Sequence, residues 1–125
     1  MPFQYVRDDT KRRIRATLTD PLTVDDLIAL VEHQLEDATW RYGMVIDARS
    51  VRVFTFKPIE MQQFVARVRA LIGAHGPRGP VAIVSRQVGV ISGGEIYNSF
   101  GGQSETFWNM DEAETFLDQR SFPIP

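Results

Sequence analysis

The residues best placed to do chemistry follow a short apolar segment near the middle of the chain. Asp47 closes the run Gly43-Met44-Val45-Ile46, and Arg49 and Arg52 come soon after it. Such a run predicts a strand buried on both faces of a parallel sheet, and α/β sheets bind ligands at the ends of such strands. A carboxylate and two guanidinium groups at that rim would contact an anion or a protein partner. In the commoner alternative, Asp47 caps the turn and pairs with an arginine, with no ligand involved.

The connection that follows is apolar for a loop. Its sequence is Val51-Arg52-Val53-Phe54-Thr55-Phe56-Lys57. These valines and phenylalanines either fold into the core or leave an exposed apolar patch, and such patches mark partner or ligand surfaces. Phe54 and Phe56 have the same parity, so we expect at least one of them to point outward. Both interpretations stay open, and the candidate site comprises Asp47, Arg49, Arg52, Phe54, Thr55, Phe56 and Lys57.

Other reactive residue types form no recognisable enzyme motif. The chain has no cysteine and two histidines, His33 and His75. Thiol nucleophiles, disulfides and thiolate metal sites are therefore excluded, and no second histidine lies at helical spacing to begin a metal site. Ser92 lacks the glycine two positions earlier that a nucleophile elbow needs, and no lysine completes a phosphate loop at Gly93-Gly94. We expect no enzyme activity, no metal and no cofactor, although carboxylate chemistry at Asp47 remains conceivable.

The charge distribution argues against nucleic-acid binding. Fourteen Lys and Arg residues against sixteen Asp and Glu give a net charge of −2, whereas nucleic-acid surfaces need a broad positive field. The main basic cluster is Lys11-Arg12-Arg13 with Arg15. Because apolar and polar residues alternate from Arg13 to Leu18, we expect Arg13 and Arg15 on the solvent face, protecting a sheet edge from pairing with other chains.

Periodicity and capping residues predict the elements that position these side chains. Strands are expected at 3–6, 13–18, 43–48, 81–84 and 106–108. Helices are expected from an N-cap at Thr23 to about Glu36 (with His33 on the solvent side), from Pro58 to Ile72, and from an N-cap at Asn109 to Leu117. A weaker helix, interrupted by glycines, is predicted at 88–100.

This order, β-β-α-β-α-β-α-β-α, predicts an α/β fold: a mixed, mostly parallel sheet covered by helices, with the N-terminal hairpin as an antiparallel edge. The 125 residues, 43% of them hydrophobic, fit one domain with a real core over about 3–118 and a loose tail at 119–125. No apolar run approaches the roughly 20 residues of a membrane span, and the N-terminus lacks signal-peptide features. We therefore expect a cytoplasmic protein.

Three segments carry a resemblance to a known family: Thr23-Val24-Asp25-Asp26-Leu27, the stretch from Trp40 to Arg49, and Trp108-Asn109-Met110-Asp111-Glu112-Ala113. In their apolar spacing the chain resembles, from about 13 to 117, the SpoIIAA-like proteins of the STAS/CRAL-TRIO-type fold, relatives of the anti-sigma-factor antagonists. The resemblance implies a STAS-like fold. In the antagonists a serine in an Asp-Ser-Ser-Gly loop is phosphorylated by a partner kinase. The matching stretch here is Thr55-Phe56-Lys57-Pro58, with Phe56 at the acceptor position, so we expect no such phospho-serine switch.

Taken together, the sequence predicts a non-enzymatic STAS-like module that binds another protein, with a second copy of the chain among the candidate partners. The expected contact surface is the loop 51–57 and the start of the helix after it. The alternative is a domain that binds a small apolar ligand or a lipid, because the fold resembles that of CRAL-TRIO lipid carriers. That alternative draws on the aromatic residues Tyr97, Phe100, Phe107 and Trp108.

Overall fold

Five strands form one sheet in which the strand order follows the chain. They are β1 (Phe3–Asp8), β2 (Arg13–Leu18), β3 (Gly43–Asp47), β4 (Val81–Val84) and β5 (Ser104–Phe107). β1 and β2 pair antiparallel, and each later strand pairs parallel with the one before it. The computed structural model describes residues 3–52, 56–85, 98 and 103–120. It confirms an α/β fold with a mixed, mostly parallel sheet and an antiparallel edge.

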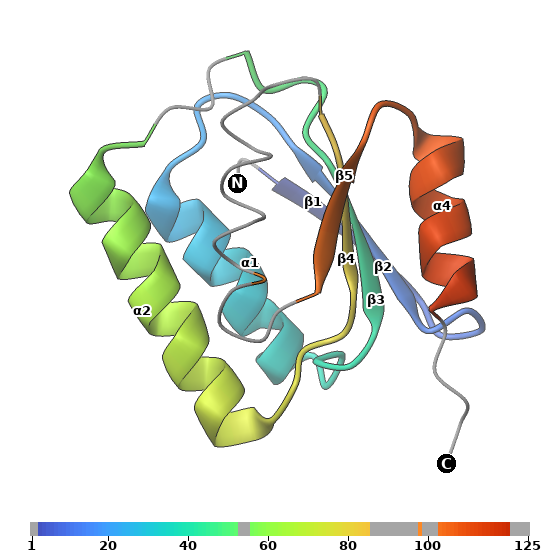
Figure 1. Cartoon of the computed structure of the whole chain (residues 1–125), viewed down its shortest axis with the longest axis horizontal. Helices are drawn as coiled ribbons and strands as arrows, with labels where there is room; N and C mark the ends of the chain where they lie inside the picture. The colour runs from blue at the N-terminus through green and yellow to red at the C-terminus, as the bar shows by residue number, and fades with distance from the viewer. Residues whose placement is uncertain (1–2, 53–55, 86–97, 99–102, 121–125) are drawn as a thin grey trace.

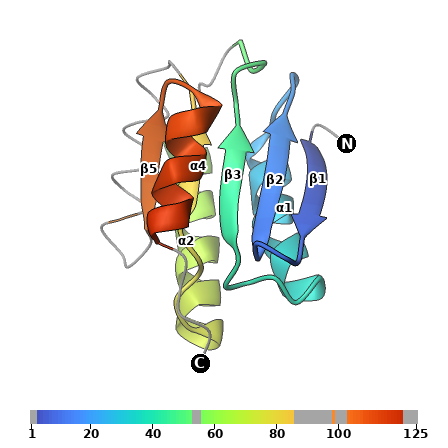
Figure 2. The ribbon, with the colours of Figure 1, turned by 90° about the vertical axis from the view of Figure 1, so that its right-hand side faces the viewer.

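Helices cover both faces of this sheet. α1 (Val24–Glu36) and α2 (Pro58–His75) lie on one face, and α4 (Met110–Gln119) lies on the other (Figure 1). α4 packs on β3, β4 and β5, so that β1 and much of β2 are left open on that side (Figure 2). The predicted helix at 88–100, apart from Asn98, and residues 121–125 of the predicted tail fall outside the described part. The tail was predicted to begin at 119, but Gln119 is the last residue of α4, so this start is wrong.

Local hydrogen bonds explain where the helices begin. At α1 the Asp26 N–H donates to Thr23 Oγ1 at 3.2 Å, and the Thr23 N–H donates to the Asp26 carboxylate at 2.9 Å. At α4 the Glu112 N–H donates to the side-chain oxygen of Asn109 at 2.9 Å. Each bond satisfies a backbone group that the first helical turn leaves without a partner. Both predicted N-caps are confirmed.

The end of α2 lies three residues beyond the predicted one, at His75 instead of Ile72. Gly73 does not stop the helix, because an isolated glycine only weakens a helix whose packing is good. The chain turns at Gly76, which has φ +84° and whose N–H donates to the Ile72 carbonyl at 2.8 Å. A positive φ is costly for residues with a Cβ, so Gly76 is the residue that ends the helix.

The sheet separates two apolar clusters. Along β3, Met44 points toward α1 and α2 while Val45 points toward α4, and both are fully buried. Alternation along a strand places consecutive side chains on opposite faces, so β3 is buried on both of them, as predicted. On β2 the apolar members of the alternating pattern, Ile14, Ala16 and Leu18, all face the α1–α2 side.

The prediction that Arg13 faces solvent is wrong. Arg13 is 7% exposed and forms ion pairs with two carboxylates of α4, Glu114 and Asp118, the latter at 2.8 Å. Arg15, on the same face of β2, is exposed and lies 3.4 Å from Glu114. The edge of the sheet is β1, and α4 lies close enough to β2 for its acidic side chains to reach Arg13.

Candidate functional site

Asp47 and Arg49 meet at the carboxyl end of β3. The Arg49 guanidinium donates to both carboxylate oxygens of Asp47, from Nε at 2.9 Å and from Nη2 at 2.8 Å, and the Arg49 N–H donates at 3.1 Å. These bonds, chiefly those from the Arg49 side chain, lower the pKa of Asp47. The pKa of Asp47 therefore lies well below neutral pH, whereas a general acid or base works best when its pKa is close to the working pH. The structure thus shows the turn cap and the arginine pair that were predicted for Asp47.

Arg52 is held at a different place. Its backbone N–H donates to the Asp20 carboxylate at 2.9 Å, just before the connection that leads into α1. Val51, immediately before it, is 2% exposed and belongs to the core under α1 and α2. The start of the apolar connection therefore folds inward at Val51 and returns to the surface at Arg52.

The second half of the connection leads into α2. Phe54 and Thr55 lie outside the described residues. Phe56 is half-buried, and Lys57 is exposed, with its N–H donating to Glu60 at 2.8 Å. That bond caps the first turn of α2 and fixes the direction in which the helix leaves the loop.

Ile59 was not among the predicted site residues. It lies on the first turn of α2 and is 57% exposed. Its position supplied a signal that could have been used, because Ile59 is off the stripe of Phe64, Val68 and Leu71 that faces the core. An isoleucine outside the buried stripe of a helix is left in water unless a partner covers it.

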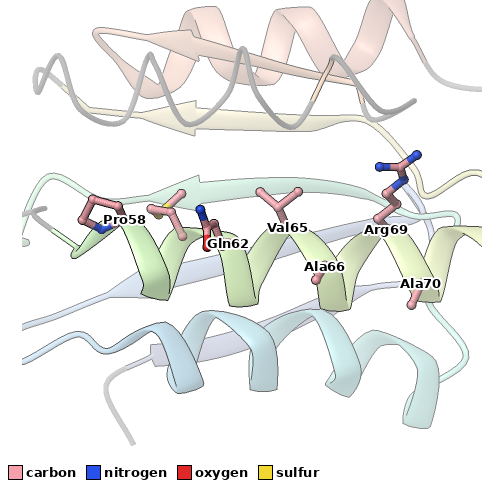
Figure 3. A pocket seen from close by; sticks show the side chains of 7 residues that line it. Pro58, Gln62, Val65, Ala66, Arg69 and Ala70 are labelled. Carbon is pink, nitrogen blue, oxygen red and sulfur yellow. The ribbon is translucent and has the colours of Figure 1, made fainter.

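An open groove of about 760 Å³ runs along α2. Met61 and Val65 are half-buried and line this groove. Gln62, Val65 and Arg69 project from α2 on the side away from α1 (Figure 3). The other lining residues are Pro58, Ala66 and Ala70. α2 therefore has a second apolar face in addition to the one that packs on α1 and the sheet.

The strand order bears on the expectation of a ligand crevice beside Asp47. In open α/β sheets such a crevice forms where the order of the strands reverses. The five described strands run in chain order, with no reversal among them. Topology thus gives no special support to a small-molecule site at Asp47.

At the amino end of the parallel strands, a largely buried polar network joins two connections to β1 and α1. The Arg78 Nε donates to Gln34 at 2.7 Å, and the Gln34 amide donates to the Thr39 carbonyl at 3.1 Å. The Tyr5 hydroxyl lies 2.6 Å from the Thr39 hydroxyl and donates to Asp37 at 3.0 Å. Burial is the main cause that raises the pKa of Tyr5 to about 12. We call Tyr5, Gln34, Asp37, Thr39 and Arg78 the amino-end network; it holds the connections that precede β3 and β4.

The two histidines lie at different places, His33 against the amino-end network and His75 at the end of α2. His33 is half-buried, with its ring edge-on to Tyr5 at 4.4 Å, so the expectation of a solvent-facing position is wrong in part. Tyr5 reaches across from β1 to cover this side of α1. His75 is exposed at the end of α2, with its ring centre 6.1 Å from that of Trp40. Within the described ranges, no group of three or more His, Cys, Asp or Glu side chains could hold a metal ion.

None of the helices in the described part of the chain has the length and apolar character that crossing a bilayer requires. Compared with known proteins, the chain matches no family model and no curated protein.

Proposed function

We propose that this chain is a non-enzymatic STAS-like module that binds another protein through Phe56, Lys57, Pro58 and Ile59, here named the α2-start surface. The observation that carries the proposal is the 57% exposure of Ile59 beside the half-buried Phe56. Burying an aliphatic side chain of this size contributes about 1.5–3 kcal/mol. Because Ile59 is already partly buried, a partner that covers it would gain roughly half of that free energy.

The surroundings of this surface favour a protein partner. Exposed cationic residues, Lys57 within it and Arg52 on the preceding connection, lie close to it along the chain. An apolar centre with a charged rim is the usual composition of a protein–protein interface. The Glu60 cap holds its helical end, which lowers the conformational entropy lost on binding.

The STAS-like part of the proposal draws on the order of elements. The described elements follow one another as β-β-α-β-α-β, then β-α after residues 86–102, which is compatible with the α/β order that the sequence pattern predicts. With a phenylalanine at the position of the antagonists' phospho-serine, the proposed module binds its partner without that switch. The neighbouring hydroxyl, Thr55, lies outside the described residues.

The test compares partner capture by variants that change one exposed apolar side chain each. Tagged wild-type protein and the Ile59→Glu and Phe56→Asp variants are used to recover bound proteins from cells that make the chain naturally. The control is Trp108→Glu, because Trp108 is 66% exposed but lies after β5. We expect a protein recovered with the wild type and the control, and a loss of at least tenfold with Ile59→Glu and Phe56→Asp. Equal recovery with all four proteins would rule out this surface.

A second candidate function rests on the groove along α2. Its volume of about 760 Å³ lies within the roughly 300–1,000 Å³ typical of small-molecule sites, and most of its lining is apolar. It ranks below protein binding because ligand sites bury most of their ligand, whereas this groove is open. Native mass spectrometry separates the two: a co-purifying apolar molecule that is lost in Val65→Glu supports a ligand site, and a clean apo mass contradicts it.

A further inference from the structure

β1 is the outermost described strand on its side of the sheet, and it pairs with β2 alone among the described strands. It is six residues long, from Phe3 to Asp8, and lies at the margin of the sheet (Figure 2). Near its middle, Val6 is 60% exposed, on the face that α4 leaves open. An edge strand with an exposed apolar residue is a template for pairing with another strand.

The hydrogen bonds of β2 show which backbone groups of β1 face outward. The Arg12 carbonyl accepts from the Gly43 N–H of β3 at 3.2 Å, so the Arg13 N–H, on the other side of the same peptide unit, points toward β1. Backbone direction alternates along a strand, and Arg13, Arg15 and Thr17 therefore bond to β1. Their partners in the register are Asp8, Val6 and Gln4. The outward N–H and C=O groups of β1 consequently belong to Phe3, Tyr5 and Arg7.

We propose that two copies of this chain pair antiparallel through β1, with Val6 of each copy opposite Val6 of the other. In this register Tyr5 and Arg7 of the second copy exchange backbone hydrogen bonds, which uses the groups that face outward. Val6 then occupies a non-hydrogen-bonded position, where opposing Cα atoms are only about 4.5 Å apart and side chains make their closest contact. The two exposed valines cover each other.

Charge selects this register over its neighbours. Opposing residues must lie on the same face, so the axis can pass through Tyr5, Val6 or Arg7 but not between them. An axis through Arg7 sets Val6 against Asp8 of the second copy, so that the valine faces a carboxylate. An axis through Tyr5 sets Val6 against Gln4 of the second copy, so that the valine contacts an amide. The axis through Val6 instead sets Gln4 against Asp8, an amide donor facing a carboxylate.

Ion pairs within each copy remove the remaining repulsion near the axis. The Arg7 guanidinium lies 3.0 Å from the Asp37 carboxylate and also pairs with Asp9. Arg15, beside Val6 on the open face, lies 3.4 Å from Glu114. The pattern is complementary to itself, and this favours a second copy over an unrelated strand.

The interface would be small. Two six-residue strands bury less than the roughly 1,200 Å² at which specific interfaces usually begin. We therefore expect a dimer that dissociates on dilution, between about 1 mM and about 10 µM.

Sedimentation equilibrium of the purified full chain over that concentration range tests the dimer. The wild type is expected to change from monomer to dimer mass, while Val6→Glu, which sets two carboxylates across the axis, stays monomeric. Ile59→Glu is the matched control and should dimerise like the wild type, because Ile59 lies in the proposed partner surface and not on β1. A wild type that is monomeric throughout, or a Val6→Glu variant that dimerises equally well, overturns the proposal whether or not the α2-start surface binds a partner.

The absence of cysteine from the sequence allows a direct test of the register. Cysteines at position 6 would have Cα atoms within the roughly 4.4–6.8 Å that a disulfide needs, whereas cysteines at position 4 would be offset by about 13 Å along the strands. Under mild oxidation, we expect Val6→Cys to form a covalent dimer at least tenfold faster than Gln4→Cys, which lies on the same face of β1. Equal rates, or faster cross-linking at position 4, would contradict this pairing.

Discussion

The two ends of the parallel strands differ in how their side chains are satisfied. In the amino-end network, buried polar groups bond one another, and no buried side-chain nitrogen or oxygen of the described residues lacks a partner. At the carboxyl end, Asp47 and Arg49 neutralise each other, while Ile59 and Lys57 extend into solvent. The hydrogen bonds at the amino end connect parts of the fold to one another. The exposed part of Ile59 is apolar area that burial in the described part of the chain does not use, and a partner can therefore cover it without breaking contacts that hold the fold.

The largest expected effect comes from breaking the amino-end network. Gln34→Ala removes the acceptor of Arg78 Nε and the donor to the Thr39 carbonyl in a site without water access. Leaving buried polar groups without their partners should lower the free energy of unfolding by about 2–4 kcal/mol. Urea unfolding measures the change. The control is Gln62→Ala, at an exposed position of α2, whose free energy of unfolding should stay within about 0.5 kcal/mol of the wild type. Similar losses for both variants would show that the network is not what holds this end.

A smaller loss is expected where α4 attaches to the sheet. Arg13→Met keeps most of the side-chain volume but leaves Glu114, at the boundary of the core, with only its longer contact to the exposed Arg15. Because Asp118 is largely exposed and can be hydrated, the loss should be about 1–3 kcal/mol. Arg15→Met is the control, since exposed ion pairs contribute about 0–1 kcal/mol. A larger effect at Arg15 than at Arg13 in the same unfolding experiment would contradict the burial of Arg13.

The Asp47–Arg49 pair should contribute less still, and its contribution should depend on pH. Its folded-state pKa is lowered, so the stabilisation is present at pH values above the ordinary carboxyl pKa of about 4 and is lost as the pH falls through the lowered value. Because half of the Arg49 side chain is exposed, Asp47→Asn should cost under about 1 kcal/mol at neutral pH. The difference between wild type and variant in urea unfolding should shrink below about pH 4. If the difference between wild type and variant grew on acidification, the predicted loss of stabilisation at low pH would be wrong.

Sequence predicted the features of this fold that local chemistry decides. Thr23 and Asn109 cap helices because their bonds reach only three residues ahead. Arg13 could not be placed in the same way, because its partner Glu114 lies 101 residues further along the chain. Gln34 gave a readable signal: it lies seven residues after Leu27 and three after Val31, on the apolar stripe of α1, where a polar side chain has to find a buried partner.

The candidate site shows the same difference between local interactions, which the sequence predicted, and long-range packing, which it did not. Pairing of Asp47 with Arg49, two residues away, was one of the interpretations that sequence offered. Whether the connection 51–57 is buried or exposed depends on how α2 lies against the core, and the sequence left both options open. The structure places Val51 inside and Lys57 outside.

The smallest effect on stability is expected at Ile59. Because its side chain is 57% exposed, Ile59→Glu should change the free energy of unfolding by no more than about 0.5 kcal/mol. Urea unfolding of the variant beside the wild type measures this. A loss of several kcal/mol would mean that Ile59 holds the fold, and the distinction between the two ends of the sheet would fail.

The most direct test of the account is a calorimetric titration of the captured partner, once purified, into wild-type protein and into Ile59→Glu. The proposed interface predicts a dissociation constant at least tenfold higher for the variant, which is about 1.4 kcal/mol of binding free energy, with the fold intact. The same dissociation constant for both proteins would contradict it.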